Sequence, residues 1–249
     1  MTATVMMAST LKNDKESVSA QFKGGGPIGT VLAVAYGDLH VKGYVDVPEI
    51  DLPRNGKKLP VGQAVGKNGK LTVIKDMGMR DPYVGQVNLV SGEIAEDFAM
   101  YFTASEQTPS VVSLGVLVDD TGVQSAGGLL LQLLPGADEH AIQAIETCLP
   151  RFKDISASLQ ELGADGCIDA LLGSLKPVLL HKRCPQYRCD CSRERIERML
   201  VTLGREELGD MIEKEGHAEI SCQFCEKKYN FNADELKALL QAADSEEKE

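Results

Sequence analysis

The 249-residue sequence contains no tryptophan, and aromatic residues make up only 5% of it. Val, Ile and Leu must therefore supply most of any hydrophobic core, and a hydrophobic content of 43% is enough for them to do so. Basic residues are outnumbered, 26 against 37 acidic ones, which gives a net charge of −11. Because an acidic surface repels phosphate backbones and anionic lipids, we expect no nucleic-acid partner and no membrane partner.

The chain also lacks long apolar runs. No stretch of about 18 apolar residues occurs, so we expect no transmembrane helix. The apolar N-terminus has no basic region before it and ends in the polar residues 12–15, which argues against a secretory signal. We therefore predict a cytoplasmic protein, in which seven cysteines indicate metal or redox chemistry rather than a framework of structural disulfides.

Motifs of common enzyme classes are missing as well. The sequence has no H-E-x-x-H, no G-x-S-x-G and no P-loop, and its four histidines are scattered: His40, His140, His181 and His217. Residues 24–29 formally match G-x-G-x-x-G, but a β-branched apolar run follows where a dinucleotide loop needs a helix. We interpret this glycine-rich stretch as a turn between strands, and we predict a protein that is not an enzyme.

The hydrophobic pattern predicts an α+β fold with a largely antiparallel sheet. Strands are expected within residues 16–47, 71–74, 83–90, 111–118 and 127–135, with the segment 111–118 buried, and a helix is expected at residues 93–103. Residues 138–180 show helical spacing, interrupted near Pro150 and again near Gly163. Because this helical stretch has few long apolar residues on any second face, we expect it to dock on another part of the chain.

Four cysteines near the C-terminal end form two short pairs. Cys189 and Cys191 are one residue apart, and Cys222 and Cys225 form a C-x-x-C pair after a gap of thirty residues, 192–221. Four thiols that a fold brings together make a tetrahedral all-sulfur site, which suits zinc best. In a small domain, the free energy of zinc binding is largely the free energy of folding.

The same four thiols would also form a redox switch, because the metal keeps them as oxidisable thiolates. Since each pair is close in sequence, oxidation can form the disulfides Cys189–Cys191 and Cys222–Cys225, and each would remove two ligands from the zinc. Of the remaining cysteines, we expect Cys148 and Cys167 to be buried and inert. For Cys184, two roles fit the sequence: a spare metal ligand or a resolving thiol.

Several stretches resemble one family, the redox-regulated bacterial chaperones known as the thirty-three-kilodalton heat-shock protein family. The resemblance is strongest in residues 188–193 (RCDCSR) and 219–231 (EISCQFCEKKYNF), with the thirty-residue gap between the cysteine pairs. Residues 24–27, 83–87, 97–107 and 127–135 are similar to the core domain of that family. The family's first strand and helix have no counterpart, so the core domain is expected to be short at its N-terminus.

The resemblance implies a chaperone core domain at residues 1–136, a metastable helical linker at 137–183 and a zinc-binding redox-switch domain at 184–249. It implies an ATP-independent holdase that is inactive when reduced and zinc-bound. Oxidative stress would then form the disulfides, release the zinc and unfold the linker, so that apolar surface becomes available to unfolding client proteins, often with homodimerisation. The zinc ligands and redox cysteines of the family correspond to Cys189, Cys191, Cys222 and Cys225.

Two other functions fit part of the pattern. A zinc ribbon that binds nucleic acid would use the same ligands, but residues 184–249 carry 10 basic and 16 acidic residues, a net charge of −6. A thiol–disulfide oxidoreductase would also use paired cysteines. Such an enzyme would turn over disulfide substrates, whereas a holdase only prevents aggregation.

Overall fold

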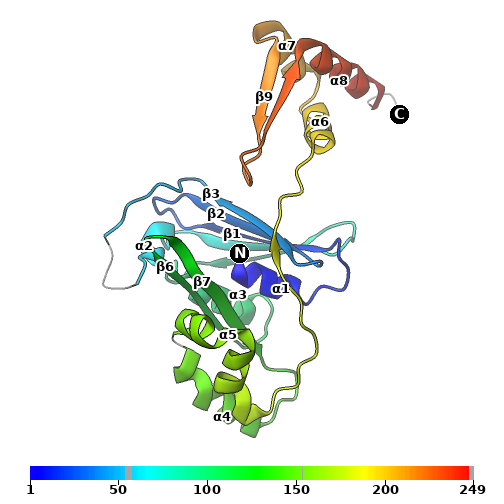
Figure 1. Cartoon of the computed structure of the whole chain (residues 1–249). Coiled ribbons are helices and arrows are strands. Elements are labelled where there is room, and N and C mark those ends of the chain that lie inside the picture. Colours follow the sequence, from blue (N-terminus) through cyan, green and yellow to red (C-terminus); the bar gives the residue numbers. More distant parts are fainter. Residues whose placement is uncertain (54–57, 153, 247–249) are drawn as a thin grey trace. The chain divides into compact units, whose positions relative to one another are not determined.

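The computed structural model describes residues 1–53, 58–152 and 154–246 and divides into two compact units, Met1–Tyr187 and Arg188–Glu249 (Figure 1). Each unit has its own cluster of buried apolar side chains. Within the described ranges, no helix is both long and apolar enough to span a membrane. The mixed α+β class with an antiparallel sheet core is confirmed.

Six strands form the main sheet of the first unit, in the order β5-β4-β1-β2-β3-β8. They are β1 (Ser17–Lys23), β2 (Thr30–Tyr36), β3 (His40–Val45), β4 (Lys70–Asp76), β5 (Tyr83–Asn88) and β8 (Gln186–Tyr187). Neighbouring strands pair antiparallel except β3 and β8, which run parallel over two residues. The sequence pattern predicted the first five strands and missed β8, because two residues carry no periodicity.

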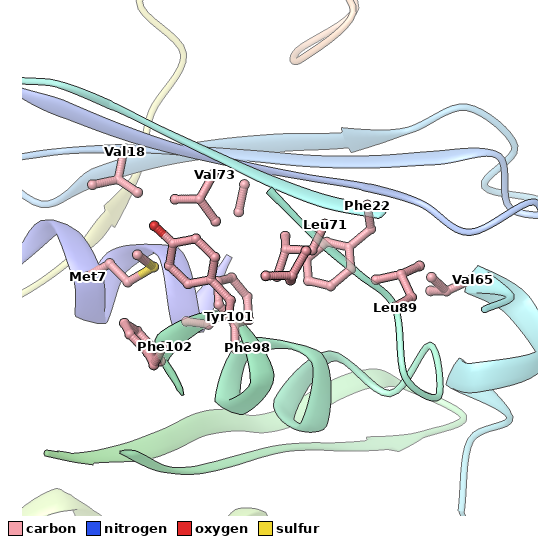
Figure 2. Close-up of a cluster of buried hydrophobic side chains, with 13 residues drawn as sticks. Met7, Val18, Phe22, Val65, Leu71, Val73, Leu89, Phe98, Tyr101 and Phe102 are labelled. Atoms are coloured by element: carbon pink, nitrogen blue, oxygen red, sulfur yellow. The ribbon is translucent and has the colours of Figure 1, made fainter. Parts of the chain in front are cut away.

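One face of this sheet carries the main core. Alternate residues of β1 point into it, namely Val18, Ala20 and Phe22, as the period of two requires. The helices α1 (Thr2–Ala8) and α3 (Ile94–Ala104) pack against the same core, and Phe98, Tyr101 and Phe102 of α3 are buried in it (Figure 2). A short helix α2 (Val61–Val65), which the loop-like composition of its surroundings concealed, adds Val65.

A second, two-stranded sheet lies between α3 and the following helices (Figure 1). It consists of β6 (Ser110–Asp119) and β7 (Gly122–Gln132). Val112, Leu114 and Leu130 pack toward the main core, whereas Val111 and Leu129 pack toward the helices on the other face. The prediction that residues 111–118 form a strand is confirmed, but their predicted full burial is wrong. They are mostly half-buried, because a hairpin of two strands leaves its edges uncovered.

The helical stretch that follows packs on this hairpin. It contains α4 (Glu139–Cys148), the 3-10 turn η1 (Leu149–Phe152), α5 (Ile155–Leu172) and the 3-10 turn η2 (Gly173–Leu175). The predicted interruption near Pro150 is confirmed by η1, and the predicted break near Gly163 is confirmed by its φ of 67° inside α5.

The helical prediction for residues 176–180 is wrong. No helix or strand occurs between η2 and β8, and Lys176 has a left-handed conformation with φ of 49°. Pro177 explains this end of the helix, because a proline disfavours the helical conformation of the residue before it.

The glycine-rich stretch at residues 24–29 is a turn, as predicted. It leads directly into strand β2 rather than into a helix. A Cβ atom on Gly24 would lie 2.3 Å from the carbonyl oxygen of Gly66, so the turn packs backbone against backbone. This geometry excludes the helix N-terminus that a dinucleotide loop would need at this position.

In its described residues, 188–246, the second unit contains three helices and a β-hairpin: α6 (Arg193–Thr202), α7 (Arg205–Lys214), β9 (His217–Ser221), β10 (Lys228–Asn232) and α8 (Ala233–Glu246). Its core is small and consists of Ile196, Leu200, Leu208, Ala218, Tyr229, Phe231 and Leu236. Side chains cap the starts of two of its helices. Ser192 Oγ accepts a hydrogen bond from Arg195 N at 3.2 Å, and Asn232 and Glu235 form a reciprocal capping box.

Candidate metal and redox centre

Two turns of the second unit bring the paired cysteines together. Cys189 and Cys191 immediately precede α6, whereas Cys222 and Cys225 lie in the turn that joins β9 to β10. That turn is closed by two backbone hydrogen bonds, from Cys222 N to Lys227 O at 3.0 Å and from Glu226 N to Cys222 O at 2.7 Å. Glu226 adopts a left-handed conformation, with φ of 59°, so the chain reverses tightly and both sulfur atoms face the same side.

The four sulfur atoms all lie within 4.8 Å of one another. Cys189 Sγ is 3.6 Å from Cys222 Sγ, and Cys191 Sγ is 3.4 Å from Cys225 Sγ. A zinc ion with Zn–S bonds of about 2.3 Å in a tetrahedron places its ligand sulfurs roughly 3.8 Å apart. The observed separations and the all-thiol donor set therefore fit a metal ion of the zinc type.

The electrostatics of the cluster are uneven. The Tyr229 hydroxyl donates a hydrogen bond to Cys191 Sγ at 3.1 Å, and this bond lowers the pKa of Cys191 from its ordinary value near 9 to about 7. Burial away from water raises the pKa of Cys189 to about 12, because the charged thiolate loses its solvation. Without a metal ion, one thiol of the cluster is therefore much more acidic than its neighbour two residues away.

Arg193 connects the elements that carry the cysteines. Its guanidinium lies over the Phe231 ring, 4.3 Å from the ring centre, and it donates to Asn230 O at 3.0 Å. It also forms ion pairs with Glu197 at 3.1 Å and Glu235 at 2.7 Å. One side chain at the start of α6 thus contacts β10 and α8, and it fixes the cysteine pair before α6 relative to the hairpin.

The other cysteines lie outside this cluster. Cys148 and Cys167 are buried in the apolar cluster of α4 and α5, as predicted, and burial raises the pKa of Cys167. Cys184 is exposed and lies in the irregular segment before β8. Among the described residues, the four paired cysteines are the one group of three or more possible metal ligands.

Sequence reasoning missed two residues of the site, Tyr229 and Arg193. The alternation of β10 was a usable signal for the first, since Tyr229 and Phe231 share the buried face of that strand. It could not show that a phenol oxygen reaches a sulfur 38 positions earlier in the chain. For Arg193, the sequence carries no signal that separates it from the other basic residues of the chain.

Comparison with known proteins shows that most of the chain is similar to the members of one family. The family model described as Hsp33 protein matches residues 1–232. Similar curated proteins named 33 kDa chaperonin come from Clostridium perfringens strain SM101, with 46% identity over 97% of this chain and 78% of the relative, and from Clostridium beijerinckii, with 44% identity over 96% and 83%.

A solved structure is also similar over nearly the whole chain. It is the crystal structure of the 33 kDa chaperonin, or heat shock protein 33 homologue, of Thermotoga maritima, with 37% sequence identity. The match has a TM-score of 0.86 and covers 98% of this chain and 83% of the other. The chain, with its cluster of four cysteines, belongs to the Hsp33 family of chaperones.

Proposed function

We propose that this protein is a redox-regulated, ATP-independent holdase that binds unfolding proteins in the cytoplasm under oxidative stress. The reduced form holds one zinc ion on Cys189, Cys191, Cys222 and Cys225 and does not bind clients. Oxidants convert the four thiolates to disulfides and release the zinc. The observation that carries this proposal is the meeting of four thiols within 4.8 Å in a unit with a small core.

The metal acts in this proposal as part of the fold of residues 184–249. The apolar core of the unit consists of a few side chains from three helices and one hairpin, which is little for a segment of this length. Structural zinc contributes on the order of 10–16 kcal/mol to the folding of finger peptides. Release of the zinc therefore unfolds the redox-switch domain, although residues 1–136 keep their own core.

The linker of the proposal, residues 137–183, is held weakly by its own contacts. Among the side chains that the structure describes, the cluster that holds α4 and α5 on the hairpin β6–β7 has five buried members, of which two are cysteines. After Leu175 the chain has no helix or strand before β8, and Val178, Leu179 and Leu180 are 80%, 65% and 79% exposed. These side chains border a groove of about 950 Å³ that is also lined by Leu11 and Leu39.

Apolar side chains of this kind are the surface that an unfolding client needs. When the linker unfolds, we expect its own apolar residues and the faces of β6 and β7 that it covered to become available together. The same exposure accounts for homodimerisation of the activated protein.

The disulfides of the proposal are Cys189–Cys191 and Cys222–Cys225. The short sulfur contacts of the folded cluster, Cys189 to Cys222 and Cys191 to Cys225, run between the pairs. Loss of zinc removes the constraint that holds the two turns together, and the closest thiol in the unfolded segment is then the sequence neighbour. Peptide mapping of the oxidised protein distinguishes the local pairing from the crossed one.

The decisive experiment follows zinc release and client aggregation in the same sample. Reduced, zinc-loaded protein is incubated at elevated temperature with and without peroxide, with a chromogenic zinc chelator and a thermally unfolding client. We expect zinc release and suppression of light scattering to appear together, and only with oxidant. Sedimentation of the two forms measures the expected dimerisation.

Equal suppression of aggregation by the reduced and oxidised forms would contradict the redox switch. Catalytic turnover of insulin disulfides would indicate an oxidoreductase instead of a holdase. Salt-dependent binding of DNA or RNA would indicate the zinc-ribbon function.

A further inference from the structure

We infer that Tyr229 is a positioning residue that sets the order in which the cysteines of the cluster react with oxidant, because its hydroxyl hydrogen bond makes Cys191 the least nucleophilic thiolate of the metal-bound site. The inference deepens the proposed function and rests on it. It concerns which thiolates oxidant attacks first, whereas the proposed function concerns what the loss of the metal does.

The position of Tyr229 is determined by the β9–β10 hairpin. Tyr229 pairs with Ile220 in the antiparallel register, two residues before Cys222. It lies on the buried face of β10 beside Phe231 and is 5% exposed, so its ring has little freedom to turn away. The ring packs in the core of the unit while its hydroxyl points at Cys191 Sγ from 3.1 Å.

A hydrogen bond has a defined effect on a metal-bound sulfur. The metal already holds all four thiols as thiolates, so a donor changes their reactivity and not their protonation state. A donor withdraws electron density from the sulfur lone pairs, and groups next to the ligands of a metal site tune those ligands in this way. We therefore expect Cys191 to react with oxidant later than the other three ligands.

The reaction that this bond slows is the attack of the Cys191 thiolate on the oxidant. A thiolate sulfur attacks one oxygen of hydrogen peroxide, the O–O bond breaks, hydroxide leaves and a sulfenic acid remains on the cysteine. A second thiolate then attacks that sulfenic sulfur, which forms the disulfide and expels another hydroxide. One molecule of peroxide accepts the two electrons that two thiolates lose when they form a disulfide. Each thiolate that is lost weakens the binding of the metal.

Tyr229→Phe tests the inference, because it removes the hydroxyl and keeps the ring. The rate of zinc release from the reduced, zinc-loaded full chain is measured at several peroxide concentrations. The slope against peroxide reports attack on sulfur, and the intercept without peroxide reports spontaneous loss of metal. We expect the oxidation rate of Cys191 itself, followed by alkylation and peptide mapping, to rise about three- to tenfold in this variant, the factor that corresponds to one ordinary hydrogen bond. The slope for zinc release should rise by a smaller factor, because the other three thiolates already react with peroxide in the wild type.

A matched control separates reactivity from stability. Phe231→Leu truncates the neighbouring ring on the same face of β10, and that ring has no hydrogen-bonding group. This control should raise the intercept and leave the slope unchanged. Alkylation and peptide mapping after brief oxidation should show Cys191 modified late in the wild type and among the first cysteines in Tyr229→Phe.

The outcomes separate the role of Tyr229 from the redox switch itself. If Tyr229→Phe changes only the intercept, as Phe231→Leu does, Tyr229 is a core residue and the inference is wrong. If the wild type releases no zinc with peroxide at all, the proposed redox switch itself fails, whatever the variant does.

Discussion

Gly115 of β6 lies directly against Ser156 at the start of α5. A Cβ atom on Gly115 would be 2.8 Å from the Cβ atom of Ser156 and 3.0 Å from a methyl group of Ile155. Ser156 cannot rotate its Cβ away, so only a glycine lets the helix approach the hairpin this closely. Gly127, which pairs with Gly115 across the hairpin, leaves similar room for Leu159.

Gly115→Val should therefore loosen α5 without any oxidant. Overpacking of this kind costs about 1–3 kcal/mol, and the least stable element in contact has to move. We expect the reduced, zinc-loaded variant to suppress client aggregation partially and to lose amide protection across α5. Hydrogen exchange and light scattering measure the two effects.

Gly173→Ala is the matched control for that variant. A Cβ atom on Gly173 meets no heavy atom within 4 Å, so this change should leave both measurements close to the wild type. A Gly115→Val protein that keeps full protection of α5 would show that the close approach is not needed to hold the linker.

Cys189→Ser should lower zinc affinity by more than about 100-fold. Loss of a group that only hydrogen-bonds to a metal ligand already costs up to about 100-fold, and loss of a ligand should cost more. Competition with a chromogenic chelator measures this affinity. Cys184→Ser is the control, since Cys184 is exposed and does not belong to the four-sulfur cluster. Full zinc affinity in Cys189→Ser would refute the ligand assignment, and loss of affinity in Cys184→Ser would extend it.

Zinc affinity should fall with decreasing pH, and more steeply below about pH 7. The pKa of Cys189 is raised by burial to about 12, so zinc must expel its proton throughout the neutral range. The pKa of Cys191 is lowered by Tyr229 to about 7, so below that pH a further proton competes with the metal. Because the pKa of Cys191 is lower in the folded state than in the unfolded chain, its thiolate also stabilises the metal-free fold. This stabilisation is lost as the pH falls through about 7.

Chelator competition at a series of pH values between 6 and 9 measures this dependence. In Tyr229→Phe the pKa of Cys191 should return toward its ordinary value near 9, so the change in slope should move to higher pH. An unchanged profile in that variant would mean that the hydrogen bond does not control the acidity of Cys191.

A hydrogen bond from the Arg183 guanidinium attaches the segment before the second unit to the turn between β2 and β3 of the main sheet. Arg183 donates to Gly37 O at 2.6 Å, next to the two-residue pairing of β8 with β3. Arg183→Ala should destabilise this attachment by about 1.5–3 kcal/mol, the range for a hydrogen bond to a charged group. Faster amide exchange at Gln186, whose N–H donates to Leu39 O, measures the loss.

Lys182→Ala is the neighbouring control. Lys182 pairs with Asp165, but both side chains are about two-thirds exposed, and such a pair contributes less than about 1 kcal/mol. Equal effects of the two substitutions on Gln186 would show that Arg183 has no special role.

Much of the fold was predictable because its elements are periodic. The alternation of Val18, Ala20 and Phe22 is the signal for β1, and capping residues at Ser192 and Asn232 are local signals in the sequence for the starts of α6 and α8. The approximate end of the linker helices was not predictable from apolar spacing, which continued past Leu175. Pro177 was the local signal that should have taken precedence.

For the candidate site, the spacing of Cys189, Cys191, Cys222 and Cys225 was sufficient by itself to predict a four-sulfur cluster, because few other arrangements use two such pairs. Spacing could not show the partners of the sulfurs. The hydrogen bond from Tyr229 and the guanidinium of Arg193 over Phe231 depend on the hairpin register and on how α6 packs against it.

The sequence alone thus determined the kinds of element, the four cysteines of the cluster and the acidic balance of charge, since periodicity, thiol chemistry and charge are properties of residue types. The tertiary structure decided which sulfur receives a hydrogen bond, how closely Gly115 lets α5 approach, and where Arg183 attaches the chain. Those relationships join residues far apart in the chain, and only packing brings them within the few ångströms over which such contacts act.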